Sequence, residues 1–209
     1  MKKVRVLLMA IAAIAAVGMW GTVFAVHSGA EEKAYGEVTV VPTPDRTEST
    51  EHPLFVKEVY EPVVPDGTNI AEEAKMEANG YNDVYTPRKA KDGKTAGVSY
   101  WEGAPDAYPN ILTATFEEGK SIHAIKVCLC PQSVWGARTQ TFSVEISADG
   151  ENFEELIPSK DYEFNPNTAN EVVLEFDTVT CKAVQLVFTA NTGASGAQVA
   201  EFEIYSADN

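Results

Sequence analysis

The chain has 209 residues, which is enough for one ordinary domain together with a leader and a linker. It carries 31 acidic and 16 basic residues and a formal net charge of −15 at pH 7. A surface with this charge repels phosphate groups, so the composition excludes nucleic acid as an expected partner and disfavours docking on anionic lipid. Uncharged glycans and divalent cations remain as partners.

The first 30 residues are typical of a bacterial export signal. Three basic residues among the first five precede an uncharged, apolar stretch over residues 6–26. Signal cleavage would follow Ala25 or Ala30. The apolar stretch is also long enough to cross a bilayer as a helix, so we predict a signal peptide or an N-terminal membrane anchor over residues 1–30. In both cases the rest of the protein is extracellular, secreted or anchored at the cell surface, and only the uncleaved form contacts a membrane.

Residues 31–67 are predicted to form a linker or stalk. The segment is rich in Pro, Glu and Thr, and its prolines lie too close together for a helix or a central strand. Short extended pieces over residues 37–41 and 55–60 could add edge strands to the following domain, and the sequence leaves this open.

From residue 68 to residue 209 the chain has the pattern of an all-β domain. Apolar runs of strand length alternate with turn residues, and no convincing amphipathic helix is present. Segment 69–78 suits a helix by propensity and a strand by alternation, and we predict a strand there. The other predicted strands span residues 98–101, 111–116, 122–129, 142–147, 153–157, 172–176, 183–190 and 199–205. This arrangement favours an antiparallel β-sandwich of the jelly-roll type.

The clearest strand runs from residue 142 to residue 147. Phe142, Val144 and Ile146 alternate with polar residues, as in a strand with one face on a core. The Asp149-Gly150 pair that follows predicts a hairpin turn, because glycine readily adopts positive φ.

The cysteines are Cys128, Cys130 and Cys181, an odd number for an exported protein. Cys128 and Cys130 share one face of an extended segment, so only one of them could pair with Cys181. A zinc site would need a fourth ligand and a different spacing. We expect structural or idle thiols, and the sequence does not choose a pairing.

Four short sequences, in chain order, carry a family resemblance. They are Asn69-Ile70-Ala71; Lys91-Asp92-Gly93 with Ser99-Tyr100-Trp101-Glu102; residues 135–140 with Ser147-Ala148-Asp149-Gly150; and Asn191-Thr192-Gly193 with residues 200–205. Together they resemble the discoidin-like, coagulation factor 5/8 type C domains, and among them the bacterial carbohydrate-binding modules of family 32. The resemblance covers residues 69–206 and implies a galactose-binding-domain-like fold.

The resemblance implies a structural calcium site. Carried over by position, its ligands would be Asp92, Ser99 and Glu201. Carboxylate, hydroxyl and carbonyl oxygens are the ligands that a hard cation prefers, and these three residues would connect the two ends of the domain.

The resemblance also implies a glycan as ligand. A sugar site needs an aromatic plane for the apolar face of a ring and planar polar groups for its hydroxyls. Trp135 is the strongest candidate because it stands in a loop beside Gly136. The other candidate contacts are Trp101, Glu102, Tyr108, Arg138 and Asn191.

Catalytic motifs are absent from the sequence. It holds no Gly-x-Ser-x-Gly elbow, no His-Glu-x-x-His pair and no phosphate-binding glycine loop. We therefore predict a noncatalytic carbohydrate-binding module of an exported protein, not an enzyme. The alternative is a surface adhesion or structural protein whose sandwich binds another cell-surface protein. Fold alone cannot choose the sugar.

Overall fold

The computed structural model describes residues 35–52 and 55–207. The predicted signal peptide or anchor, residues 1–30, lies outside these ranges. Within them no helix has the length and apolar character needed to cross a membrane.

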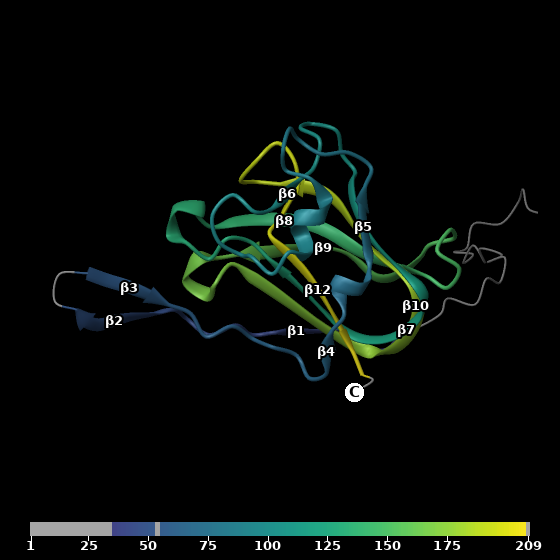
Figure 1. Ribbon diagram of the computed structural model, residues 1–209, viewed down its shortest axis with the longest axis horizontal. Helices are drawn as coiled ribbons and strands as arrows, with labels where there is room; N and C mark the ends of the chain where they lie inside the picture. The colour runs from purple at the N-terminus through teal and green to yellow at the C-terminus, as the bar shows by residue number, and fades with distance from the viewer. Residues whose placement is uncertain (1–34, 53–54, 208–209) are drawn as a thin grey trace, which may run out of the picture. The chain divides into compact units, whose positions relative to one another are not determined.

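Two long antiparallel strands form the centre of the domain. β7 (Asn110–Cys128) and β10 (Glu171–Asn191) pair along most of their length. Their register shifts between Glu175 and Val179 and again between Cys181 and Ala183. Figure 1 shows the two strands side by side as they curve at the right of the view. The bend allows each strand to contribute one half to each layer of a sandwich.

Each layer is completed by shorter antiparallel strands on either side of one half of β7 and β10. In the first layer the order is β5-β7-β10-β8-β9, and in the second it is β4-β12-β7-β10-β1. The strands of the first layer are β5 (Lys75–Ala78), β8 (Arg138–Ser147) and β9 (Glu154–Phe164). Those of the second are β1 (Thr39–Val41), β4 (Thr68–Asn69) and β12 (Glu201–Ser206). The predicted antiparallel β-sandwich is confirmed.

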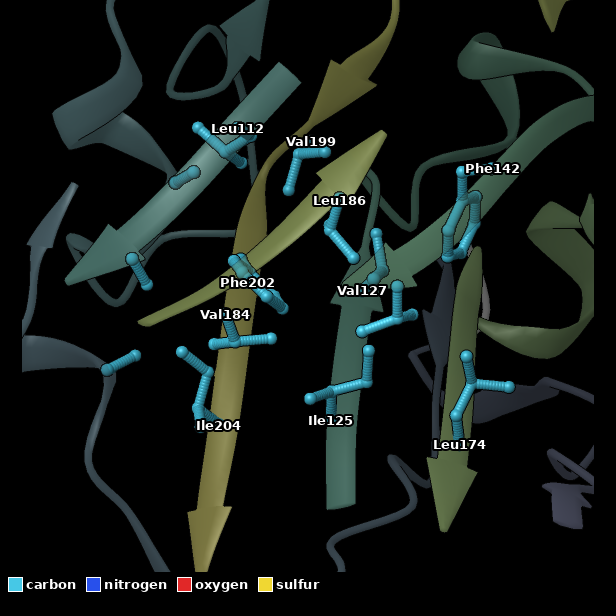
Figure 2. Close-up of a cluster of buried hydrophobic side chains, with 14 of the residues drawn as sticks. Leu112, Ile125, Val127, Phe142, Leu174, Val184, Leu186, Val199, Phe202 and Ile204 are labelled. Carbon is cyan, nitrogen blue, oxygen red and sulfur yellow. The ribbon is translucent and has the colours of Figure 1, made fainter. Parts of the chain in front are cut away.

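The core lies between the two layers and is built by alternation along the strands. Inward side chains from β7, β8, β10 and β12 interlock, and Figure 2 shows this cluster. Its labelled members are Leu112, Ile125, Val127, Phe142, Leu174, Val184, Leu186, Val199, Phe202 and Ile204, all of them buried. Each buried methylene group stabilises the folded state by about 0.8 kcal/mol, so this cluster is the main stabilising feature of the domain.

The predicted hairpin at Asp149-Gly150 is confirmed. Gly150 has a φ of +87°, and β8 and β9 pair on either side of the turn. The Asp149 carboxylate accepts hydrogen bonds from the backbone N–H groups of Glu151 and Asn152, each at 2.8 Å. These bonds lower the pKa of Asp149 well below its usual range.

Several predicted strand boundaries were wrong. Segments 111–116 and 122–129 are one strand, β7, because the extended backbone continues between them and pairing with β10 resumes at Lys120 and Ser121 after a register shift. The same holds for 172–176 and 183–190 in β10. In segment 69–78, Asn69 ends β4 and the last four residues form β5, with one 3-10 turn, η1 (Ala71–Glu73), between them.

The loops contain short elements of their own. Segment 98–101, predicted as a strand, is extended and paired only in β6 (Trp101–Glu102), whose partner is β11 (Gln198–Val199). The 3-10 turns η2 (Pro87–Lys91), η3 (Ser133–Trp135) and η4 (Pro166–Thr168) complete the connections.

The predicted linker contributes to the sheet. β1 pairs with β10, with Val41 opposite Val173. β2 (Thr47–His52) and β3 (Phe55–Val59) form a two-stranded sheet of their own. The extended pieces foreseen near residues 37–41 and 55–60 are therefore strands, although only the first joins the sandwich.

All three cysteines are free and buried. Cys181 lies in the core, and burial raises the pKa of its thiol to about 11. Burial also raises the pKa of Cys128. The Cys128 and Cys181 thiols are therefore protonated at neutral pH and are poor nucleophiles and metal ligands.

Candidate functional site

A groove of about 310 Å³ lies where three connections of the sandwich meet. They are residues 92–100 between η2 and β6, residues 129–137 between β7 and β8, and residues 192–197 between β10 and β11. Each begins or ends at a paired strand, so the sheet fixes the positions of their ends. The groove is lined by Gly97, Val98, Tyr100, Val134, Trp135, Arg138 and Gln198.

Three aromatic rings form a continuous row at the groove. Tyr85 and Tyr100 stack with ring centroids 4.4 Å apart, and Tyr100 meets Trp135 edge-on at 4.8 Å. Burial and a hydrogen bond with Tyr85 raise the pKa of Tyr100. Because each ring contacts its neighbour, Trp135 is held in place and presents a preformed apolar surface.

Planar polar side chains lie next to this row. The Arg138 guanidinium lies over the Trp135 ring, with Cζ 5.0 Å from the centroid, and donates a hydrogen bond from Nη1 to Gln198 Oε1. Gln198 Nε2 donates to Glu102 Oε2 at 2.9 Å, and Asn82 Nδ2 donates to Glu102 Oε1 at 2.7 Å. The four polar groups form a fixed hydrogen-bonded chain that ends at the groove.

Buried backbone contacts fix the base of this chain. Gln140 Nε2 donates to the Gln198 carbonyl at 2.9 Å, and the Gln198 N–H donates to Gln140 Oε1 at 2.8 Å. Burial lowers the pKa of Arg138, but a guanidinium stays charged at physiological pH. The site therefore offers one cation, several oriented amide groups and an aromatic face, a combination suited to a polar ligand with an apolar side.

Two of the predicted ligand contacts, Trp135 and Arg138, line the groove. Glu102 lies behind it and orients Gln198. Trp101 is fully buried in the core and donates from Nε1 to the Gly80 carbonyl at 3.1 Å. Since no face of this indole is accessible, Trp101 is removed from the candidate contacts, and its place in a paired strand explains the burial.

The remaining two predicted contacts do not line the groove. Tyr108 is half-buried and packs against the core. Asn191 shapes its own loop, because Nδ2 donates to the Gly196 carbonyl and Oδ1 accepts from the Gly193 N–H, both at 2.8 Å. This Asx-type turn gives Asn191 a positioning role.

Sequence reasoning missed five lining residues, namely Gly97, Val98, Tyr100, Val134 and Gln198. Tyr100 directly precedes β6, Gln198 is the first residue of β11, and Val98 and Val134 are apolar residues outside the strands. Val134 carried a usable signal, because it lies outside every predicted strand and the core does not need it, whereas Val98 was assigned to the predicted strand 98–101. Nothing in the sequence singled out Gln198, which directly precedes the predicted strand 199–205.

The three predicted calcium ligands lie together beside β12. The Ser99 hydroxyl donates a hydrogen bond to Asp92 Oδ2. The Lys94 N–H lies 3.1 Å from Asp92 Oδ1 and 3.0 Å from Glu201 Oε1. The two carboxylates thus share one donor, although their residues lie more than a hundred positions apart in the chain.

The chemistry of this cluster fits a hard cation. Glu201 is only 5% exposed, and burial, together with the nearby Asp92 carboxylate, raises its pKa to about 7. Two adjacent carboxylates and a hydroxyl are the oxygen donors that calcium prefers. Two carboxylates are few for a metal site, and among residues 35–52 and 55–207 no group of three or more His, Cys, Asp and Glu side chains is placed to hold a metal. Further ligands would have to be backbone carbonyls or water.

The comparison with protein families decides the classification. The model of the F5/8 type C domain matches residues 71–202. The chain belongs to this family. Among curated proteins no relative was found.

Solved structures with this F5/8 type C fold include several carbohydrate-binding modules. One is a pectin-binding carbohydrate-binding module, with 23% identity and a TM-score of 0.54 over 66% of this chain and 93% of that one. Another is CpGH89CBM32-5 from Clostridium perfringens in complex with GalNAc-β-1,3-galactose, with 19% identity and a TM-score of 0.55 over 66% and 100% of the two chains. A third is the CBM32 of AlyQ in complex with 4,5-unsaturated mannuronic acid, with 16% identity and a TM-score of 0.52 over 66% and 96%. At these identities the likeness shows a common fold.

Proposed function

We propose that the F5/8 type C domain of this protein is a noncatalytic carbohydrate-binding module. The observation that carries the proposal is the groove, in which the Trp135 ring and the Arg138 guanidinium lie 5.0 Å apart with Gln198 hydrogen-bonded beside them. An aromatic face packs against the apolar side of a pyranose, while guanidinium and amide groups bind its hydroxyls. The groove combines both requirements within one small site.

The sugar-bound structures with the same fold support this proposal. CpGH89CBM32-5 and the CBM32 of AlyQ were each solved with a sugar ligand. Catalysis is not part of the proposed function, because the groove is lined by one titratable cation, Arg138, and by Tyr100, whose pKa is raised. Neither group is suited to act as a general base near neutral pH.

A structural calcium ion at Asp92, Ser99 and Glu201 is part of the proposal. When bound, calcium would neutralise the two carboxylates that now share the Lys94 N–H. Those residues would then connect the loop after η2 with β12. Residues 94–100 lead directly from this cluster to Tyr100, so an ordered cluster would help to fix one wall of the groove.

We further propose that the module acts outside the cell, secreted or held at the cell surface by residues 1–30. Its partner there would be a glycan or polysaccharide. The apolar leader, which is typical of an export signal, and the Pro-rich linker or stalk over residues 31–67 support this placement. A cell-surface protein partner is the outcome expected if no sugar binds.

The test is a glycan array probed with the full chain in calcium and in chelator. The wild-type protein is expected to bind one sugar class saturably, and Trp135→Ala is expected to lose this binding. Tyr81→Ala is the matched control, because Tyr81 is 51% exposed and does not line the groove. A blank array from a folded protein, or equal binding by both variants, would contradict the proposed site.

A further inference from the structure

Two valine side chains at the groove are strongly exposed. Val98 is 71% exposed and Val134 is 83% exposed, and both line the groove beside Tyr100 and Trp135. Single exposed apolar residues are common on protein surfaces, but apolar side chains gathered around one concave site mark a binding surface. These two valines are not part of the buried core. Their position at the groove is explained if a ligand contacts them.

Local hydrogen bonds hold both valines in these exposed positions. Val134 is the central residue of η3, which is closed by a hydrogen bond from the Gly136 N–H to the Ser133 carbonyl at 3.1 Å. The Val98 carbonyl accepts a hydrogen bond from Lys89 Nζ at 3.2 Å. The two side chains are therefore preformed parts of the groove, and little ordering cost would accompany ligand binding.

The lining of the groove divides into a polar and an apolar part. Arg138 and Gln198 supply the hydrogen-bonding groups, and the valines supply aliphatic surface in addition to the aromatic rings. A plain hexose carries hydroxyls at nearly every ring position and would leave the valines facing polar groups. A sugar with a methyl group would bury it there.

We propose that Val98 and Val134 are specificity-determining residues that select sugars carrying a methyl-bearing substituent, either an acetamido or a 6-deoxy group. This inference rests on the proposed glycan-binding function and names the class of sugar. The hydroxyls and ring of the sugar are bound by Arg138, Gln198 and Trp135, and the methyl group packs on the valines.

The size and charge of the site agree with such a ligand. A volume of about 310 Å³ lies at the small end of the range of roughly 300–1,000 Å³ for small-molecule sites, which suits a short glycan end better than a broad protein interface. Acetamido and 6-deoxy groups are uncharged, so the net charge of −15 does not oppose their binding.

The experiment compares pairs of sugars that differ in the substituent. The full chain is titrated with galactose and N-acetylgalactosamine, with glucose and N-acetylglucosamine, and with L-galactose and L-fucose, and each Kd is measured by calorimetry or NMR. Burial of one methyl group corresponds to about a four-fold change in Kd. We expect at least one pair to show a preference of this size or more for the methyl-bearing sugar, and the pair that does so identifies the kind of substituent.

The double variant Val98→Thr, Val134→Thr tests the assigned residues. Threonine keeps the β-branched shape and replaces one methyl group by a hydroxyl, so the fold is retained while the apolar surface is reduced. In this variant the ratio of the two Kd values within a sugar pair should fall toward one. Val64→Thr is the matched control, because Val64 is 66% exposed in the N-terminal segment and does not line the groove. It should leave the preference unchanged.

The outcomes separate this inference from the function on which it rests. Sugar binding without a preference in any pair, or a preference that survives in the double variant, would overturn the inference and leave the proposed function standing. Binding of none of the six sugars, together with a blank array, would overturn both and direct attention to a protein partner at the two valines.

Discussion

At the scale of single residues, Gly193 is placed to control the position of Arg138. A Cβ atom at Gly193 would lie 2.8 Å from both Cδ and Nε of Arg138. Gly193→Ala must therefore displace the guanidinium from its place over Trp135. Because charge-assisted hydrogen bonds are worth about 1.5–3 kcal/mol, we expect glycan affinity to fall by about ten-fold or more.

Stability should change little in the same variant, by less than about 1 kcal/mol, because Gly193 is exposed and an arginine side chain can move. Gly119→Ala is the control, since its nearest neighbour would be Thr180 Cγ2 at an ordinary 3.5 Å. Affinity is measured by titration calorimetry and stability by thermal unfolding. Unchanged affinity in Gly193→Ala would show that Arg138 does not bind the sugar from its present position.

The buried Glu201 carboxyl group should make the stability of the protein depend on pH. Its pKa in the folded protein is about 7, above the ordinary value of 4.5, mainly because it is buried. The folded state therefore binds more protons than the unfolded state between these values, and this contribution to stability is lost as the pH rises from about 4.5 through 7. In chelator, the melting temperature of the wild type should fall over this range relative to that of Glu201→Gln.

Calcium should reverse this trend, because it binds the deprotonated carboxylate. We expect calcium to raise the melting temperature clearly at pH 8 and much less at pH 5, and to have little effect on Glu201→Gln at either pH. Calorimetry at the two pH values, with calcium and with chelator, measures both effects. Equal calcium shifts in wild type and variant would place any bound calcium elsewhere.

A comparison of two tryptophans explains why the site residues were hard to predict. Trp101 and Trp135 are the same residue type with glycine close by, yet one is in the core and one lines the groove. The difference comes from β6, whose pairing with β11 turns Trp101 inward, and this pairing joins segments nearly a hundred residues apart. Pairing between segments so far apart cannot be predicted from the local sequence around either one.

At the scale of elements, the segment before β4 is bound to the domain through a buried ion pair. Lys126 Nζ lies 2.9 Å from Glu171 Oε2, and both residues are buried. The Val63 N–H donates to Glu171 Oε1 at 2.8 Å, and the Val63 carbonyl accepts from Lys126 Nζ at 2.9 Å. Part of the predicted linker is therefore attached to the outer face of the second layer.

Removal of one partner would leave the other charge buried. We expect Lys126→Ala to destabilise the protein by about 3–5 kcal/mol. Lys75→Ala is the control, because Lys75 pairs with Glu77 at 2.7 Å on the surface, with 73% and 56% of the two side chains exposed, and should cost less than about 1 kcal/mol. Guanidinium unfolding measures both. Equal, small effects would show that the segment around Val63 does not cover this ion pair in solution.

The sequence predicted the elements well where alternation was strong. β8 and the inward residues of β10 follow from period-two apolar patterns. Alternation stops at the bends of β7 and β10, where both neighbouring side chains can face solvent, so the pattern predicts strand ends there. The pairing of β1 with β10 could not be predicted, because its exposed residues do not distinguish an edge strand from a linker.

At the scale of the whole molecule, the central claim is that an F5/8 type C sandwich binds a sugar at the groove of Trp135. The fold supplies the buried core, and the loops and strand ends around the groove carry the proposed ligand contacts. Family membership could be predicted from four short motifs because they lie at turns and strand ends that the fold requires. The ligand could not, because Val98, Val134 and Gln198 belong to no motif.

The most direct measurement uses the tryptophan indoles as reporters. The chain has three tryptophans, and Trp101 and Trp135 differ completely in their environment. Their indole N–H signals are assigned in a nitrogen-15 NMR spectrum with Trp→Phe variants and followed while the best-binding sugar of the array is added. We predict that the Trp135 signal shifts saturably and the Trp101 signal stays in place. A bound sugar that leaves the Trp135 signal unmoved would contradict the account.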